Sequence, residues 1–494
     1  MLREGLAGRV RRVLPALTVI LGVPAILAAV YRPSYVNFDA RYCLLWARDI
    51  VHGHTPDYTG AFAPTPHPLQ TAVSVLALPF GDDSAKVMVA LVLLSLGFLT
   101  WLVYRLGAEV WTPAAGVVAA LVVASRPTFE RIALIGYQDL AFAALVAWAL
   151  LLELRRPKRG PVVLAVLALA GLVRPDAWLL SALYLAYLWR GASPRRRAQL
   201  ASLAVLAPVI WVAQDWVITG QPLHSLHGTK VLAGEVNRRR PPLTVPKRMA
   251  WYFKLLLLWP LALGVPLGLA FAWRYVRQKG TLLVGVALAL TAAVVVTSLA
   301  GLSLIQRYLL TPAALLAVFY GLGVFGWRRL PPVPERRGWK VAGLIALALS
   351  LAYLPFQATL LHRVKRTMER EARNYRDLRA LAESPAVRAH FARCGSISTI
   401  GHRAVADLRY WLDGPPGSVD LVEGVKRRVG PLLLAPRATP QMWGFDRTHF
   451  AKVKPPPGYR RLYENHSWVV YAGTGCSTGM LAAPPGGDVQ ADTG

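Results

Sequence analysis

Apolar blocks of about 18 to 22 residues recur along this 494-residue chain, and each is long enough to cross the hydrocarbon core of a bilayer. Hydrophobic residues make up 55% of the sequence. The pattern excludes an ordinary soluble domain and predicts an α-helical polytopic membrane protein with about eleven transmembrane helices. The expected spans are residues 13–31, 84–105, 112–125, 139–153, 161–173, 176–190, 198–217, 251–273, 281–302, 308–327 and 340–358.

Positive charge is concentrated between the apolar blocks. The chain has 56 Lys and Arg against 26 Asp and Glu, a formal net charge of +30. The basic residues cluster in short loops on alternate sides of the predicted spans, which is the positive-inside pattern of a plasma-membrane protein with a cytoplasmic N-terminus. Charge placed in this way faces membrane lipids, so we expect no nucleic-acid partner. The clusters lie at 9–12, 155–159, 195–197, 274–279 and 328–340.

Two domains are expected. Residues 1–358 form the transmembrane domain, and its larger outer loops are 32–83, 126–139 and 218–250. Residues 359–494 follow the last span and, with eleven spans, form an extracytoplasmic α/β domain. Its small and polar end, from about residue 484, predicts disorder. Within this domain we expect helices at 362–393 and 404–412 and strands at 396–401, 418–424, 431–435 and 467–472.

The chain has three cysteines, and two of them lie in the C-terminal domain. Outside the cytoplasm Cys394 and Cys476 are free to form a disulfide. The alternative is a pair of unbridged, buried thiols. Cys43 lies in the first outer loop.

Motifs for several common chemistries are absent from the sequence. It contains no CxxC or HExxH motif and no phosphate-binding glycine loop. Zinc chemistry therefore has no support, and we predict no metal ligands.

Charged and polar residues instead gather at predicted outer helix ends. Asp39 follows the first span closely, and a carboxylate near the hydrocarbon boundary is a better proton acceptor at neutral pH than one in water. Asp139 begins the fourth span on the same face. Arg174 and Asp176 interrupt the apolar stretch 161–190, and Arg307 precedes another span.

Each of these residues also has a purely structural interpretation. Asp139 suits the N-cap of a helix, and Arg174 with Asp176 suits a local ion pair that closes a turn. His67 could be a loop residue, and Arg307 could extend to the membrane interface. The basic run 238–240 lies in a predicted outer loop against the positive-inside pattern. It is a phosphate-binding cluster, a solvated charge run, or a sign that the span count is wrong and this loop is cytoplasmic.

The arrangement resembles the GT-C superfamily of membrane glycosyltransferases, particularly the protein O-mannosyltransferase and aminoarabinose-transferase branch. Over residues 10–330 it has an acid after the first span (Asp39), an amphipathic run (44–51), a basic-Pro motif (His67-Pro68) and a second acid (Asp139). Two positions depart from the family pattern, because Asp39 lacks the frequent neighbouring Glu and His67 replaces a lysine.

The resemblance implies an inverting glycosyltransferase that moves a sugar, of the arabinofuranose or mannose type, from a polyprenyl-phosphate donor to an extracytoplasmic glycan, glycolipid or protein. Asp39 would be the base and Asp139 the second catalytic acid. The lone carboxylate at 39 gives a divalent metal only weak support. The implied phosphate-binding residues are His67, Arg174, Arg307, Tyr308 and Arg239, and the implied substrate-orienting residues are Tyr42, Tyr137, Gln138 and Asp176.

A lipid-carrier flippase or transporter without catalysis is the main alternative. Such a protein places paired charges at mid-membrane depth and often has repeated halves. Here the acids lie at helix ends, and the sequence shows no two-fold repeat. These two features favour the enzyme.

Overall fold

The computed structural model describes residues 2–60, 62–235, 238–422, 428–437 and 454–481. The predicted disordered end, from about residue 484, lies outside the described residues, as do the last two residues of the strand expected at 418–424. The chain divides into two compact units. The first comprises residues 1–47 and 64–364, and the second comprises 48–63 and 365–494.

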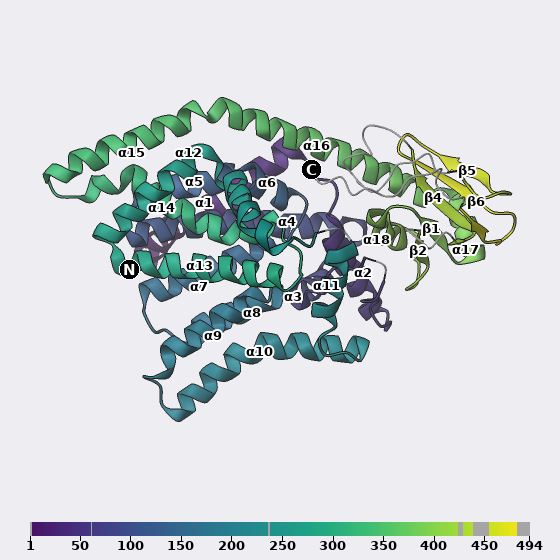
Figure 1. The fold of residues 1–494 in the computed structure, drawn as a ribbon, viewed down its shortest axis with the longest axis horizontal. Coiled ribbons are helices and arrows are strands. Elements are labelled where there is room, and N and C mark those ends of the chain that lie inside the picture. The colour runs from purple at the N-terminus through teal and green to yellow at the C-terminus, as the bar shows by residue number, and fades with distance from the viewer. Residues whose placement is uncertain (1, 61, 236–237, 423–427, 438–453, 482–494) are drawn as a thin grey trace. The chain divides into compact units, whose positions relative to one another are not determined.

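The first unit is a bundle of helices (Figure 1). Its helices begin and end as follows: α1 Leu2–Tyr31, α3 Pro68–Ala77, α4 Ser84–Val110, α5 Pro113–Ser125, α6 Pro127–Leu134, α7 Asp139–Arg155, α8 Pro161–Val173, α9 Asp176–Trp189, α10 Pro194–Thr219, α11 His224–Glu235, α12 Val245–Tyr275, α13 Arg277–Leu299, α14 Leu310–Phe325 and α15 Pro334–Ala352. Two further helices, α2 Phe38–Val51 and α16 Leu354–Ala382, begin in the first unit and end in the second.

The predicted fold class is confirmed, whereas the predicted span count is not. Among the described residues six helices are long and apolar enough to cross a membrane, or up to eight if each of two bent pairs counts as one span. The segments α5 and α8 are helical where spans were expected, but each has only 13 residues. The count of about eleven spans therefore stays a prediction.

Local sequence signals set several helix boundaries. Thr112 accepts a hydrogen bond from the backbone N–H of Ala115 at the start of α5, and Ser193 accepts one from Arg196 at the start of α10. Proline follows each of these caps, where its missing N–H costs no helical hydrogen bond. Gly220 ends α10 with a φ of 71°.

Helix α14 is the core of the bundle, because nearly all its side chains are buried. Glycines allow its neighbours to approach it closely. A Cβ on Gly268 of α12 would lie 1.6 Å from the carbonyl oxygen of Phe319, and one on Gly321 would lie 2.1 Å from that of Ala115 in α5. The backbones of α12, α14 and α5 thus pack in direct contact, as is common for small residues in membrane helices.

The second unit contains an α/β fold. A five-stranded sheet has the order β2-β1-β4-β6-β5, in which β1 is parallel to β2 and β4, while β6 is antiparallel to β4 and β5. A separate pair joins β3 and β7. The bounds are β1 Ile397–Thr399, β2 Val419–Leu421, β3 Arg428–Val429, β4 Leu432–Pro436, β5 Arg460–Glu464, β6 Trp468–Ala472 and β7 Gly479–Met480, with helices α17 Pro385–Cys394 and α18 His402–Trp411.

Most elements of this unit match the sequence-based expectations, since β1, β2, β4, β6 and α18 lie where strands and a helix were predicted. Strand β5 was missed because Arg460-Arg461 and Glu464 give it a polar sequence typical of an edge strand. The central strand β4 supplies the core with Leu432, Leu433 and Leu434, all fully buried.

A disulfide joins Cys394 at the end of α17 to Cys476, whose Cα atoms are 5.3 Å apart. Of the two alternatives left open by the sequence, the bridge is therefore the one found. Cys43 is free and buried.

Thiol counting tests this pairing. In the unfolded, unreduced protein one thiol should react with maleimide, namely Cys43, and after reduction three should react. Three reactive thiols without reduction would contradict the disulfide, and a Cys394→Ser variant, which should expose two thiols, provides the calibration.

Candidate active site

A cavity of about 240 Å³ lies in the first unit, where α7 and α9 begin and α13 ends. Asp139 and Asp176 are the first residues of α7 and α9, and Thr297 lies in the last turn of α13. The remaining walls come from the chain around Asp39, from residues 64–70, from residues 211–232 and from residues 302–308. Segments far apart in the sequence thus meet at one set of helix ends.

Asp39 is held in the first turn of α2 by Asn37. The side-chain oxygen of Asn37 accepts a hydrogen bond from the backbone N–H of Ala40 at 3.1 Å, and its amide nitrogen donates to the carbonyl oxygen of Ile135 at 2.8 Å. Asn37 therefore satisfies a free N–H at the start of α2 and links that start to the turn before α7. This link brings Asp39 and Asp139 to the same cavity.

Five charged side chains alternate in sign along one wall. Arg307 donates from Nη2 to Asp39 Oδ2 at 2.8 Å, and its Nε lies 3.6 Å from Asp139 Oδ2. Arg174 donates from Nη1 to Asp139 Oδ1 and from Nε to Asp176 Oδ2, the latter at 2.9 Å. The order is Asp39, Arg307, Asp139, Arg174, Asp176, and every neighbouring pair attracts. We call this set the ion chain.

The ion chain shows which contacts the predicted charged residues make. Arg174 forms the expected local pair with Asp176 and also binds Asp139. Gln138, and not Asp139, occupies the N-cap of α7, so the Asp139 carboxylate is directed to arginine. The side chain of Arg307 is only 18% exposed, because it pairs with Asp39 instead of extending into solvent.

Tyrosine rings cover both guanidinium groups. The Cζ of Arg307 lies 4.1 Å from the ring centroid of Tyr137, and the Cζ of Arg174 lies 4.0 Å from that of Tyr308. These are cation–π distances, and they fix the planes of the arginines as well as their charges. Tyr137 and Tyr308, both predicted site residues, therefore orient the arginines.

His67 lies at the N-cap of α3 with its ring edge against Trp211, at a centroid distance of 5.7 Å. Burial lowers the pKa of His67 to about 3; Asp39 opposes this shift, while Arg174 and Arg307 add to it. The imidazole is therefore neutral at physiological pH. His67 is thus a neutral hydrogen-bonding group in this cavity, and its role in phosphate binding stays a prediction.

Several buried polar atoms that line the cavity have no hydrogen-bond partner among the described residues. They are His67 Nδ1, Gln70 Oε1, Gln138 Oε1 and Arg307 Nε. Buried polar groups in folded proteins are almost always paired, so these four mark where a polar ligand would bind. The set combines donors with acceptors, which suits the hydroxyls of a sugar and the oxygens of a phosphate.

Two predicted site residues lie away from the cavity. Tyr42 is 2% exposed and packs against Phe38 and Trp46, so it belongs to the core next to α2. Arg239 donates to the carbonyl oxygen of Lys230 at 2.6 Å, whereas its neighbour Arg238 lines the cavity.

Asp215 was missed by the sequence analysis. It lines the cavity and accepts hydrogen bonds from the backbone N–H and the hydroxyl of Ser225, at 2.7 and 2.6 Å. These bonds join the end of α10 to the start of α11. The available signal was a carboxylate inside the predicted span 198–217, since ionisable residues within spans are rare.

No group of three or more His, Cys, Asp or Glu side chains that could hold a metal ion occurs among the residues that the structure describes. The ion chain explains why the three nearby aspartates do not form such a metal-binding group. An arginine separates each aspartate from the next, so their carboxylates are each committed to a guanidinium.

Stability at acid pH tests the burial of His67. An unfolded histidine binds a proton below about pH 6.5, whereas folded His67 remains neutral down to about pH 3. In that window the unfolded state binds more protons, so this residue contributes a loss of stability as the pH falls. Between pH 7.5 and 5 the unfolding midpoint in detergent should fall further for wild type than for His67→Gln; equal falls would contradict a buried neutral imidazole.

Comparison with known proteins identifies the fold that carries this cavity. No protein-family model and no curated protein sequence matches the chain. Among solved structures, ArnT from Cupriavidus metallidurans, an aminoarabinose transferase, is similar in its apo state with a TM-score of 0.56 and 14% identity, over 95% of this chain and 99% of that one. The same enzyme bound to undecaprenyl phosphate gives 0.54 and 15%, over 94% and 98%.

The oligosaccharyltransferase of Archaeoglobus fulgidus, in complex with zinc and sulfate, is similar with a TM-score of 0.51 and 13% identity, over 85% of this chain and 68% of that one. Both neighbours are GT-C glycosyltransferases. At such low identity the likeness establishes architecture, and it extends through both units of the chain. The protein therefore has the GT-C fold that its sequence predicted.

Proposed function

We propose that this protein is an inverting glycosyltransferase that moves a monosaccharide from a polyprenyl-phosphate donor to an acceptor outside the cytoplasm. The ion chain carries the proposal, because it places a carboxylate and two fixed cations beside unpaired hydrogen-bonding groups in one cavity. The shared fold supports it, since one neighbour of that fold was solved with undecaprenyl phosphate. An arabinofuranose or mannose donor and a cell-envelope glycan, glycolipid or protein acceptor are the finer proposals.

Asp39 acts as the base in this mechanism. Its carboxylate takes the proton of the acceptor hydroxyl as that oxygen attacks the anomeric carbon from the face opposite the phosphate. The bond to the phosphate oxygen breaks at the same time, and the polyprenyl phosphate leaves with the electron pair, so the anomeric configuration inverts. A positioned base of this kind contributes about 100- to 10,000-fold to the rate.

Arg307 connects the base to the leaving group. Its Nη2 holds Asp39, while its Nε lies 3.6 Å from Asp139 Oδ2 without a hydrogen bond and would donate to a phosphate oxygen. Charge that develops on the departing phosphate is then stabilised by a cation that is already in place. Asp139 fixes both arginines and so acts through them.

The charge balance of the cavity calls for a further cation. The three aspartates and two arginines of the ion chain leave one net negative charge, and Asp215 adds another, so the cavity would repel an anionic donor. We assign the compensating role to Arg238, which lines the cavity, in place of Arg239, whose guanidinium is held by the Lys230 carbonyl. Neutral His67 and the amide of Gln138 would bind uncharged oxygens of the donor.

The orientation in the membrane follows from the positive-inside pattern. With a cytoplasmic N-terminus, we propose that the cavity and the C-terminal α/β unit face the outside of the plasma membrane. A donor made at the inner leaflet must then be flipped before it is used.

Substitution of Asp39 tests the mechanism. Asp39→Asn keeps the shape and removes the base, so sugar transfer should fall by about 100-fold or more with unchanged folding. The assay uses purified protein in detergent with radiolabelled polyprenyl-phosphate arabinose and mannose, scoring sugar release and transfer. The matched control is Asp83→Asn, because Asp83 is 61% exposed and pairs with Lys86 outside the cavity.

Wild-type turnover in Asp39→Asn would refute Asp39 as the base. Binding of a donor without turnover in the wild-type protein would instead favour a lipid-carrier transporter. Inverted product stereochemistry, read by NMR of the transferred sugar, is required by direct displacement, and retention would exclude it.

The arginine run provides a second test with its own control. Arg238→Gln should raise the KM for the donor about tenfold, equivalent to about 1.4 kcal/mol of binding, with kcat little changed. Arg239→Gln removes the same charge one residue away and should leave the KM near the wild-type value. A larger rise in KM for Arg239→Gln than for Arg238→Gln would assign phosphate binding to Arg239, the residue that the sequence indicated.

A further inference from the structure

A second cavity, of about 710 Å³, lies in the first unit where α12 ends and α13 begins. The candidate active site lies where α13 ends, so the 23 residues of this helix, about 34 Å, separate the two cavities. This length matches the hydrocarbon core of a bilayer, about 30 Å thick. The second cavity therefore belongs to the other membrane surface, which is the cytoplasmic one in the orientation proposed above. We call it the inner cavity.

One part of the inner cavity is apolar. Its lining residues come from α12, α13, α14 and α15, and the apolar ones deepest in the bundle are Leu269, Ala270, Val284 and Phe319. Val284 lies seven residues along α13 from Arg277, the first residue of that helix, a distance of about 10 Å. The apolar wall thus extends from the membrane surface into the hydrocarbon region, where an acyl chain would cover it.

The other part is a rim with two arginines. Arg274 lies in the last turn of α12, Arg277 begins α13, and both line the inner cavity. The Cζ of Arg277 lies 4.3 Å from the ring centroid of Trp273, and that of Arg274 lies 5.5 Å from the ring centroid of Tyr275. Cation–π contacts of this kind hold the guanidinium planes and leave their N–H edges available.

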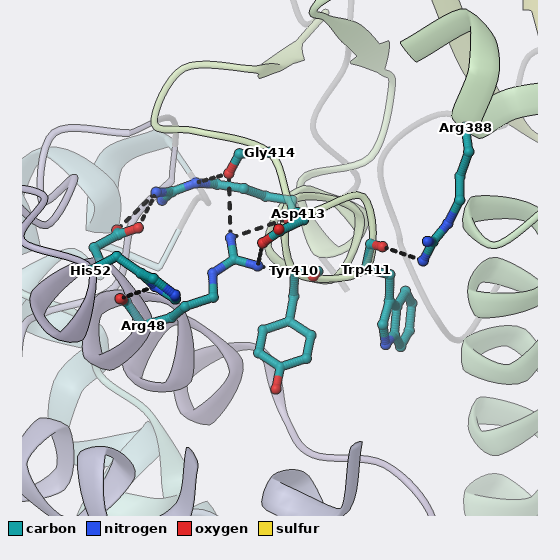
Figure 2. A network of polar contacts seen from close by, with 9 residues as sticks. Arg48, His52, Arg388, Tyr410, Trp411, Asp413 and Gly414 are labelled. Carbon is teal, nitrogen blue, oxygen red and sulfur yellow. Dashed lines mark hydrogen bonds and ion pairs between the residues drawn. The ribbon is translucent and has the colours of Figure 1, made fainter. Parts of the chain in front are cut away.

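These two guanidinium groups lack protein acceptors. Within the part of the chain that the structure describes, neither makes an ion pair or a side-chain hydrogen bond. Arg48 of the second unit shows the alternative, since it donates to the carbonyl oxygen of Tyr410 at 3.1 Å and to Asp413 Oδ1 at 2.8 Å (Figure 2). A ligand with anionic oxygens would supply the acceptors that the rim does not contain.

Aromatic side chains place the rim at the level of lipid headgroups. Trp273 is 63% exposed, and Trp339 of α15 donates from Nε1 to the hydroxyl of Tyr275 at 3.2 Å. Tryptophan and tyrosine concentrate at membrane–water interfaces because their rings are apolar and carry one polar group. The arginines beside them therefore lie where the phosphates of lipids are found.

Positive charge prevails around the inner cavity. Glu335 is the only acidic residue among the described ones that line it, against Arg274 and Arg277. The chain directly after Glu335 is also basic, at residues 336, 337 and 340. A positive rim above an apolar wall complements the two parts of an anionic phospholipid, its charged headgroup and its acyl chain.

We propose that the inner cavity binds one anionic phospholipid. Its phosphate lies between Arg274 and Arg277, and an acyl chain lies along Val284 and Phe319. The bound lipid would connect the turn between α12 and α13 to α15. The proposal is independent of the proposed function, because the inner cavity and the candidate active site share no lining residue.

Native mass spectrometry of the purified protein tests this site. Dioleoyl phosphatidylglycerol and dioleoyl phosphatidylcholine are titrated separately, and the Kd of the first bound lipid is measured. Wild type should bind phosphatidylglycerol about fivefold or more tightly than phosphatidylcholine, and Arg274→Gln and Arg277→Gln should each weaken phosphatidylglycerol binding about fivefold. Equal affinities of wild type for the two lipids would overturn the proposal.

The matched control is Arg190→Gln. Helix α9 begins at the candidate active site and ends before Arg190, which is exposed and lines neither cavity. The variant removes the same charge from the same membrane face, so its affinity for phosphatidylglycerol should stay within about twofold of wild type. A loss equal to that of the rim variants would indicate diffuse attraction to a basic surface and would overturn the site. An unchanged unfolding midpoint in lipid-free detergent shows that each variant has folded.

Two further measurements test the placement of the lipid. Glu335→Gln removes a carboxylate that repels the headgroup, so it should tighten phosphatidylglycerol binding about two- to fivefold. Equal or weaker binding would overturn this placement of the phosphate. Glycerol 3-phosphate offers the phosphate without acyl chains, and at millimolar concentration it should leave phosphatidylglycerol bound. Displacement would show that the inner cavity binds small anions and not a lipid.

Discussion

The candidate site depends on the pairing of opposite charges where water is scarce. A single buried charge is strongly unfavourable, and removing one partner of a buried pair costs about 3–5 kcal/mol. Asp139 and Arg174 have side chains only 6% and 9% exposed, and each remains acceptable because the other is present. The same pairing fixes the ends of α7 and α9, so the walls of the cavity and its chemistry share one cause.

The alternation of negative and positive side chains along the ion chain also limits which ligands the site can bind. Because each guanidinium lies between two carboxylates, neither arginine is a free cation, and an anionic ligand must bind through the edges that remain unpaired. Arg307 Nε is one such place, since it lies 3.6 Å from Asp139 Oδ2 but makes no hydrogen bond. The arrangement favours a ligand whose negative charge grows during the reaction. It does not favour a ligand that is fully charged and tightly held from the start. This difference is what stabilises a leaving group.

The sequence predicted the residues better than their contacts. Span length and the positive-inside pattern placed Asp39, Asp139, Arg174 and Arg307 at helix ends, because those signals depend on local composition. The partnership of Arg174 with Asp139, 35 residues apart, depends on how three helices pack, which local patterns do not record. The sequence also could not show that His67 is buried, and this burial keeps its imidazole neutral.

The division of the chain was the least predictable feature. A boundary near residue 359 follows from hydropathy, since the last apolar block ends there, but nothing in the composition of 48–63 separates it from the rest of its loop. Its membership in the second unit arises from paired charges 360 or more positions apart, Arg48 with Asp413 and Asp49 with Arg409. Pairings between residues so far apart in the sequence leave no local pattern, so hydropathy and composition could not assign 48–63 to the second unit.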